Sequence, residues 1–147
     1  MLKLNQKDPK WAKVLIGKSK ETIAKSGCTI TSTAMFSDWY GCYKDPAWMA
    51  KNLEFTTGGF LYWRSITKSA LPMKFVYRYY YNDMKKIKQI LASKDGVCLL
   101  QVNGNHWVAL VGASWKGLRV NDPYYGDTIY LNQRNYKVTG FAELTRK

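Results

Sequence analysis

The sequence contains one histidine and three cysteines among its 147 residues. A single histidine leaves too few nitrogen ligands for most zinc sites, and Cys28, Cys42 and Cys98 form no CxxC pair. The odd number of cysteines and their wide spacing also argue against a disulfide framework. We therefore expect no metal site and no other cofactor.

The chain also lacks long apolar runs. No stretch approaches the roughly 20 apolar residues that a membrane-spanning helix needs, and the N-terminal residues form no segment of signal-peptide length. The sequence thus predicts a protein without a transmembrane segment that is cytoplasmic as synthesised. Action outside the cell or in a virion is compatible with this expectation.

Acidic side chains are scarce. The 23 Lys and Arg residues outnumber the 10 Asp and Glu residues, which gives a formal net charge of +13. Nucleic acid, an anionic cell-wall polymer and an anionic lipid surface would all be attracted, because long-range attraction depends on charge and not on chemistry. The basic residues are spread from Lys3 to Lys147, however, so a solubilising surface is the competing interpretation and the pattern does not favour a nucleic-acid site.

No repeat, low-complexity tract or linker divides the chain, and its length is typical of one domain, so we expect a single domain over residues 1–147. The first half is predicted to be helical. Its first helix is rich in small side chains, which suits a central helix packed on a sheet. The expected helical segments are residues 28–40, with Ser26 or Gly27 as the cap, 46–53 and 60–66.

The second half carries strand patterns. An aromatic and β-branched run over 75–81 precedes a helix over 83–93 that Asn82 is expected to cap. Helices first and strands afterwards is the α+β pattern, with an antiparallel sheet and a cleft where the two layers meet. The remaining expected strands are residues 97–102, 106–111, 117–121, 128–131 and 136–143.

Cys28 lies at the expected N-terminus of the first helix. Unpaired backbone N–H groups and the positive end of the helix dipole favour a thiolate at this position. The same N–H groups could bind the oxyanion of a tetrahedral intermediate, and Gly27 would keep the approach uncrowded. We expect Cys42 and Cys98 to be buried structural cysteines instead.

The single histidine, His106, begins a strand-like run that lies between Cys28 and Asp122 in the sequence. A thiol becomes a useful nucleophile when an imidazole takes its proton and a third polar group fixes the tautomer of that imidazole. A packed core histidine is the competing interpretation of His106. For Asp122 the competing interpretation is a turn-forming residue before Pro123.

The spacing of the strands bears on whether His106 and Asp122 can meet. If residues 108–111 and 118–121 pair as a hairpin centred on Trp115, Asp122 faces Val108 and shares one side of the sheet with His106. A slip of one residue would separate the two side chains. Asn121 and Asp127 are therefore kept as alternative orienting residues.

Several short motifs occur in a fixed order along the chain: Gln6-Lys-Asp-Pro-Lys-Trp11, Thr22-Ile23, Ser26-Gly27-Cys28-Thr29, Trp39-Tyr40-Gly41, His106-Trp-Val-Ala-Leu-Val-Gly112 and Val120-Asn-Asp122-Pro123. In this combination the sequence resembles the papain-like cysteine peptidases, and more narrowly the stand-alone domains related to the bacteriocin-leader-processing (double-glycine) peptidases. The resemblance covers nearly the whole chain and is weakest over residues 55–81.

The resemblance implies a papain-like α+β fold. It also implies that Cys28 is the nucleophile, His106 the general base and acid, and Asp122 the orienting residue. Gln6 would be a side-chain donor to the oxyanion, although only its Gln-x-Asp-Pro-x-Trp context supports that role.

Three functions then compete. The first is a cysteine peptidase or amidase that cleaves a polypeptide or the peptide part of peptidoglycan, as a phage or bacterial cell-wall hydrolase would. If exposed, Trp11, Trp39, Trp48 and Trp63 would suit an anionic, glycan-containing polymer, and a position in the core is the competing interpretation of these residues. The second is a non-catalytic or virion-associated binding module on a papain-like fold. The third is a basic nucleic-acid-binding protein, suggested by the run Tyr77-Arg78-Tyr79-Tyr80-Tyr81, in which aromatic residues flank an arginine.

Overall fold

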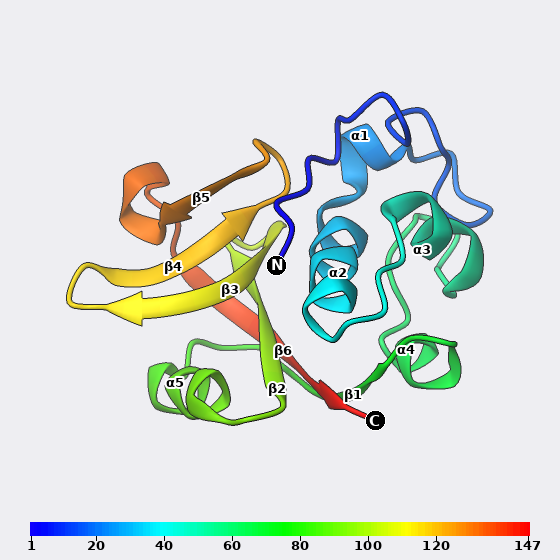
Figure 1. The fold of residues 1–147 in the computed structure, drawn as a ribbon. Coiled ribbons are helices and arrows are strands. Elements are labelled where there is room, and N and C mark those ends of the chain that lie inside the picture. Colours follow the sequence, from blue (N-terminus) through cyan, green and yellow to red (C-terminus); the bar gives the residue numbers. More distant parts are fainter.

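Four short helices come first in the chain, and six strands with one further helix follow (Figure 1). The structure is a computed structural model that describes all residues, 1–147. The helices are α1 (Ile23–Ser26), α2 (Cys28–Trp39), α3 (Pro46–Asn52), α4 (Arg64–Lys68) and α5 (Met84–Ala92). None of them has the length and apolar character needed to cross a bilayer.

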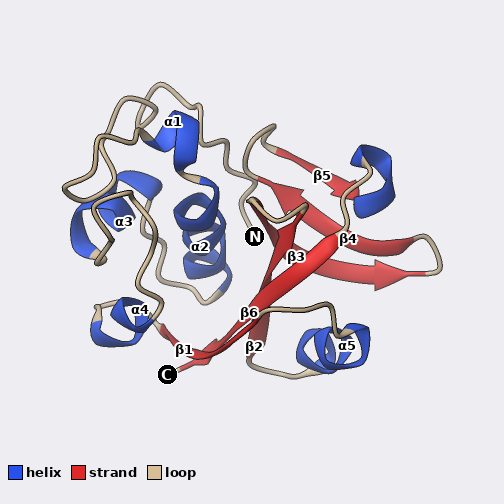
Figure 2. Ribbon diagram, turned by 180° about the vertical axis from the view of Figure 1, so that it is seen from behind, coloured by secondary structure: helices blue, strands red, loops and turns tan.

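The strands form one antiparallel sheet in the order β1-β6-β2-β3-β4-β5. Helices α1 to α4 lie on one side of this sheet, and α5 lies apart from them (Figure 2). The expected α+β class, with helices before an antiparallel sheet, is confirmed. The strands are β1 (Met73–Tyr79), β2 (Gly96–Val102), β3 (His106–Ser114), β4 (Gly117–Asp122), β5 (Asp127–Tyr130) and β6 (Val138–Arg146), and a 3-10 helix, η1 (Leu131–Arg134), follows β5.

Two hydrophobic cores cover opposite faces of the sheet, because successive side chains of a strand point to opposite faces. Leu99 and Ala109 pack in one core with Ala34 of α2. Leu100 and Val108 pack in the other core with residues of α5. The alternation along β2 and β3 therefore sandwiches the sheet between α2 and α5.

Helix α2 is the central helix that the small side chains predict. Its residues Ile30 to Ser37 are all buried, and the helix packs mainly on β3. Buried hydroxyl groups bond back to the helix backbone: Thr33 Oγ1 donates to the carbonyl of Thr29 at 2.8 Å, and Ser37 Oγ donates to that of Ala34 at 2.7 Å. The small side chains thus allow the helix to lie close to the sheet, although the buried hydroxyl groups of Thr31 and Ser32 have no hydrogen-bond partner.

Two expectations about where helices begin are wrong. Residues 60–66 were expected to be helical, but the helix begins at Arg64, because a β-bridge between Phe55 and Leu61 holds the preceding segment extended. Asn82 does not cap α5; Asp83 does, and its side chain accepts a hydrogen bond from the backbone N–H of Lys86 at 3.1 Å.

The hairpin of β3 and β4 has a shorter turn than expected. Ser114 pairs with Gly117, so the turn is not centred on Trp115 but contains Trp115 and Lys116. A bulge at Val111 then shifts the pairing by one residue, and beyond it Ala109 pairs with Asn121. Continued by one residue, this register brings Asp122 opposite Val108, which is the arrangement that the spacing predicts.

Candidate active site

A cleft of about 850 Å³ opens between the helical half and the sheet. Cys28 of α2 and His106 of β3 line it, together with Gln6 from the N-terminal arm and Tyr136 from the segment before β6. Asp122, at the end of β4, lies behind His106 and is fully buried. The fold thus brings together residues that are far apart in the sequence.

A tight junction between two helices presents Cys28. Gly27 is both the C-cap of α1 and the N-cap of α2. A Cβ atom at Gly27 would lie 2.5 Å from the carbonyl oxygen of Ile23, so a larger residue would force the junction open. Glycine is therefore needed to place Cys28, which is partly exposed, in the first turn of α2.

The other two cysteines differ from each other. Cys98 is buried in β2, as expected, and burial raises the pKa of its thiol. Cys42 is exposed, so the expectation that it is a buried structural residue is wrong. It lies in the turn after α2, where Gly41 adopts a φ of +87° and directs the chain away from the core.

The side chains of His106 and Asp122 are joined by a hydrogen bond. Nε2 of His106 lies 2.8 Å from Oδ1 of Asp122, which leaves Nδ1 as the ring nitrogen available to Cys28. Burial lowers the pKa of His106, but its hydrogen bonds to Asp122 and Cys28 outweigh burial and raise that pKa to about 9. The arrangement favours the imidazolium form.

The carboxylate of Asp122 forms hydrogen bonds with four groups. Besides His106, the backbone N–H of Tyr124 donates to Oδ1 at 3.0 Å, so Asp122 also forms the turn that its position before Pro123 suggests. The hydroxyl of Tyr136 and Nη1 of Arg134 donate to Oδ2 at 2.6 and 2.9 Å. Burial raises the pKa of Asp122, but the hydrogen bonds from His106 and Tyr136 outweigh burial and hold that pKa below its ordinary value.

Arg134 and Tyr136 were missed in the sequence. The only signal for them is indirect: a buried carboxylate needs donors, and both residues follow β5 closely. The sequence offers 23 basic residues and does not say which of them reaches Asp122. Tyr136 was assigned to the last strand, but that strand begins at Val138.

The two alternative orienting residues do not contact His106. Asn121 is the neighbour of Asp122 in β4, so its side chain points to the opposite face, where its Oδ1 accepts a hydrogen bond from Thr128 at 2.6 Å. Asp127 binds Arg134, with 2.8 Å between Oδ1 and Nη1. Asp122 is thus the carboxylate placed beside the histidine.

Gln6 lies inside the cleft and is only 1% exposed. Its backbone N–H donates to the carbonyl of Pro123 at 2.8 Å, which fastens the N-terminal arm beside the end of β4. Its side-chain Nε2 donates one hydrogen to the carbonyl of Ala24 at 3.0 Å, while Oε1 is buried without a partner. The second hydrogen on Nε2 is free for another acceptor.

Comparison with known proteins identifies structures that share this fold. No family model and no curated protein matches the chain. A solved structure of a double-glycine-motif protease from an AMS/PCAT transporter, in complex with a leader peptide, aligns with a TM-score of 0.60 and 19% identity over 93% of this chain and 94% of that one. The N-terminal peptidase C39-like domain of a toxin secretion ATP-binding protein from Vibrio parahaemolyticus aligns with a TM-score of 0.59 and 13% identity over 84% of this chain and 98% of that one.

The chain has the fold of a C39-like peptidase domain. The resemblance seen in the sequence is confirmed at the level of the fold. Within this C39-like fold, no group of three or more His, Cys, Asp or Glu side chains lies close enough together to hold a metal ion.

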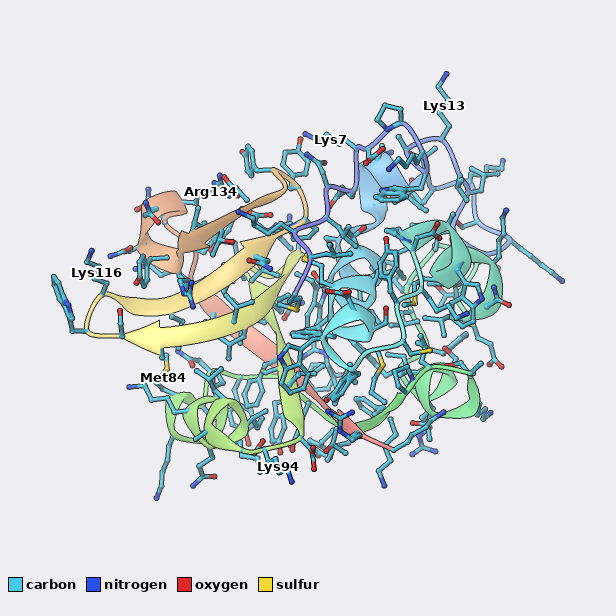
Figure 3. The ribbon with its side chains drawn as sticks, viewed as in Figure 1. Lys7, Lys13, Met84, Lys94, Lys116 and Arg134 are labelled. Atoms are coloured by element: carbon cyan, nitrogen blue, oxygen red, sulfur yellow. The ribbon has the colours of Figure 1, made fainter.

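The aromatic and basic side chains of the C39-like fold are dispersed. Trp11 is buried, Trp39 is exposed, and Trp48 and Trp63 are half-buried, so these tryptophans do not form one exposed surface. Lys13, Lys94 and Lys116 project from different sides of the molecule (Figure 3). These three lysines therefore do not belong to one basic patch.

Proposed function

We propose that this protein is a cysteine peptidase that hydrolyses a peptide bond of a polypeptide through an acyl-enzyme. The observation that carries the proposal is the position of Cys28, which lies at the N-terminus of a 12-residue helix. His106 lines the same cleft and is hydrogen-bonded to the buried Asp122. The C39-like fold supports it, because the two matched structures are peptidase domains.

In the first half of the reaction, the thiol proton of Cys28 passes to Nδ1 of His106. The sulfur then attacks the carbonyl carbon, and the electron pair of the C=O bond moves to the oxygen. When the tetrahedral intermediate collapses, the C–N bond breaks and His106 gives its proton to the departing amine. Asp122 keeps the ring oriented and stabilises the imidazolium throughout.

The oxyanion of the intermediate would be bound by two donors. One is the backbone N–H of Cys28, which belongs to the first turn of α2, where N–H groups have no partner within the helix. The other is the free hydrogen on Nε2 of Gln6, held in place by Ala24. Removing one such donor typically costs about 10²–10³ in kcat.

In the second half, a water molecule enters the cleft beside the thioester. His106 takes a proton from this water, the hydroxide oxygen attacks the acyl carbon, and the C–S bond breaks to release the acid and the Cys28 thiolate. The same histidine thus acts as acid in one half of the reaction and as base in the other.

Peptides that contain a Gly-Gly pair are the first substrates to test, because one matched structure is a double-glycine-motif protease bound to a leader peptide. We expect the wild-type protein to cleave such peptides, with two fragments detected by mass spectrometry. We expect Cys28→Ala and His106→Ala to abolish cleavage while the circular dichroism spectrum is retained.

A second measurement tests the acyl-enzyme without relying on turnover. A peptide aldehyde ending in Gly-Gly should inhibit the wild-type protein and add its mass to the peptide that contains Cys28. If neither cleavage nor mass addition occurs in the folded wild-type protein, the peptidase proposal is wrong.

A further inference from the structure

Arg78 lies in the same cleft as Cys28 but takes no part in the proposed chemistry. Its side chain starts on β1 and crosses β6 to reach β2. There Nη2 donates to Oε1 of Gln101 at 3.3 Å, while Nη1 donates to the carbonyl of Tyr79. The guanidinium is thus fixed on the face of the sheet that lines the cleft.

A glycine makes room for this guanidinium. Gly140 of β6 lies under it, and a Cβ atom at that position would stand 2.6 Å from Nη1 of Arg78 and 2.7 Å from the carbonyl oxygen of Tyr79. Any other residue at position 140 would displace the arginine. The position of Arg78 therefore depends on a glycine at this point of β6.

Aromatic rings fix the orientation of the guanidinium. Its Cζ lies 4.1 Å from the ring centroid of Tyr80 and 4.8 Å from that of Trp107, and both contacts are cation–π interactions. Trp107 is held in turn by Trp63, with 5.1 Å between the ring centroids. The cation is held in one place, while Tyr80 remains exposed to solvent.

No carboxylate neutralises this cation. Arg78 forms none of the six ion pairs of the structure. The two other basic residues that line the cleft are both paired: Lys25 with Glu21, and His106 with Asp122. A guanidinium has five N–H donors, and Arg78 uses two of them within the chain. Burial also lowers the pKa of Arg78, and this effect outweighs the opposing contribution of Tyr80. A half-buried cation of this kind is suited to an anionic ligand.

We propose that Arg78 binds a carboxylate of the polypeptide that occupies the cleft, such as the side chain of a Glu or an Asp residue. This inference rests on the proposed function, since it takes the cleft to hold a peptide. A planar guanidinium with free donors recognises a carboxylate well. A single unpaired arginine suits one carboxylate better than the row of phosphates that a nucleic acid presents.

The test measures peptide binding to a Cys28→Ala variant, which cannot cleave. Fluorescence anisotropy would be recorded for equal-length peptides that contain a Gly-Gly pair and one Glu, moved a residue at a time along the N-terminal side. Each peptide has a twin with Gln in place of Glu. We expect one position at which the Glu peptide binds at least about tenfold more tightly than its twin.

Three further variants, made in the same Cys28→Ala background, test whether the preference for Glu depends on Arg78. Arg78→Gln should reduce the Glu-to-Gln ratio to about one, and Arg78→Lys should keep part of it, because lysine retains the charge but not the fork of donors. Arg119→Gln removes the same charge from an exposed position outside the cleft and should leave the ratio unchanged.

The outcomes separate this inference from the proposed function. A ratio of about one at every position, absence of peptide binding, or a preference that survives Arg78→Gln would overturn the carboxylate site. Cleavage of Glu and Gln twins at equal rates by the wild-type protein would also overturn it, while leaving the peptidase intact. A preference that depends on Arg78 in a protein that never cleaves peptides would support the site and count against the peptidase.

Single-stranded oligonucleotides provide the last arm of the test. The run of aromatic residues around Arg78 was also interpreted as a stacking platform, and Tyr80 and Tyr81 are indeed exposed. If oligothymidylate displaces the Glu peptide and loses affinity on Arg78→Gln, the site belongs to a nucleic acid and the carboxylate assignment is wrong. We expect no displacement at physiological salt.

Discussion

The guanidinium of Arg134 joins Asp122 to Asp127. Its Nη1 lies 2.9 Å from Oδ2 of Asp122 and 2.8 Å from Oδ1 of Asp127, two residues that face each other across β4 and β5. Arg134 lies beside β5 at the end of η1 (Figure 3). Its guanidinium also lies over the ring of Tyr125, with 3.8 Å from Cζ to the ring centroid. Because Arg134 and Tyr136 occupy Oδ2, the other oxygen of Asp122 is directed to His106.

Cys28 should be the thiol that iodoacetamide labels fastest near neutral pH, because it alone combines a helix N-terminus with a histidine partner. Cys98 should stay unlabelled in the folded protein, and the exposed Cys42 should react at the rate of an ordinary thiol. Peptide mapping after short labelling times measures this. The variant Cys42→Ser removes the background, and His106→Ala should slow labelling of Cys28. Faster labelling of Cys42 than of Cys28 would contradict the assignment.

Asp122→Asn should reduce kcat less than His106→Ala, because an amide oxygen can still accept the hydrogen bond from Nε2 of His106. The amide NH₂ group would then face Arg134, which offers only donors, so the free energy of unfolding should also fall by about 1–3 kcal/mol. Peptide cleavage rates and urea denaturation check the two parts. An unchanged cleavage rate would show that orientation by Asp122 is not needed.

Tyr136→Phe should make the protein more sensitive to acid. The pKa of Asp122 is lowered in the folded state, so this residue contributes stability above its unfolded pKa and loses it as pH falls through the folded pKa. Removal of the Tyr136 hydroxyl raises the folded pKa and shifts that loss to higher pH. Acid unfolding followed by circular dichroism should show the shift, while Tyr81→Phe, at an exposed tyrosine, should not.

Cleavage of a small neutral amide should decline as pH rises through about 9. The pKa of His106 is raised to about 9, so its imidazolium persists at neutral pH and is lost above that value. The stability that this group contributes is present below its unfolded pKa and is likewise lost as pH rises through the folded pKa. The two apparent pKa values of the pH–rate profile belong to the Cys28–His106 pair. An upper limb near the ordinary histidine pKa would contradict the raised value.

Varying the salt concentration should distinguish effects of the surface charge from effects of the active site. The net charge of +13 should raise association with an anionic polymer, and this attraction weakens as salt screens it over a Debye length of about 10 Å at 0.1 M. The rate at which a neutral amide is hydrolysed should change little with salt concentration. The measurement compares poly-glutamate binding with amide hydrolysis in one buffer series. Equal salt responses would leave the charge as a solubility feature.

Local features of the sequence determined most of the secondary structure. Gly27 before Cys28 begins α2 where predicted, and Asp45 caps α3 through a 2.7 Å bond from the backbone N–H of Trp48. The apolar runs over 97–102 and 106–111 predicted strands, and β2 and β3 form there. These elements depend on propensities and caps that act within a few residues, so they can be inferred from the sequence without knowing the fold.

The tertiary structure alone decided how the site is assembled. His106 and Asp122 share a face because the bulge at Val111 compensates for a turn that is shorter than the spacing suggests. Gly112 lies beside the bulge, and a glycine within a strand is compatible with one, but it does not fix the register of the two strands. The position of Arg78 over Gly140 likewise depends on residues that are distant in the sequence. Register and burial arise from the packing of whole layers, and a shift of one residue reverses the face of every side chain in a strand.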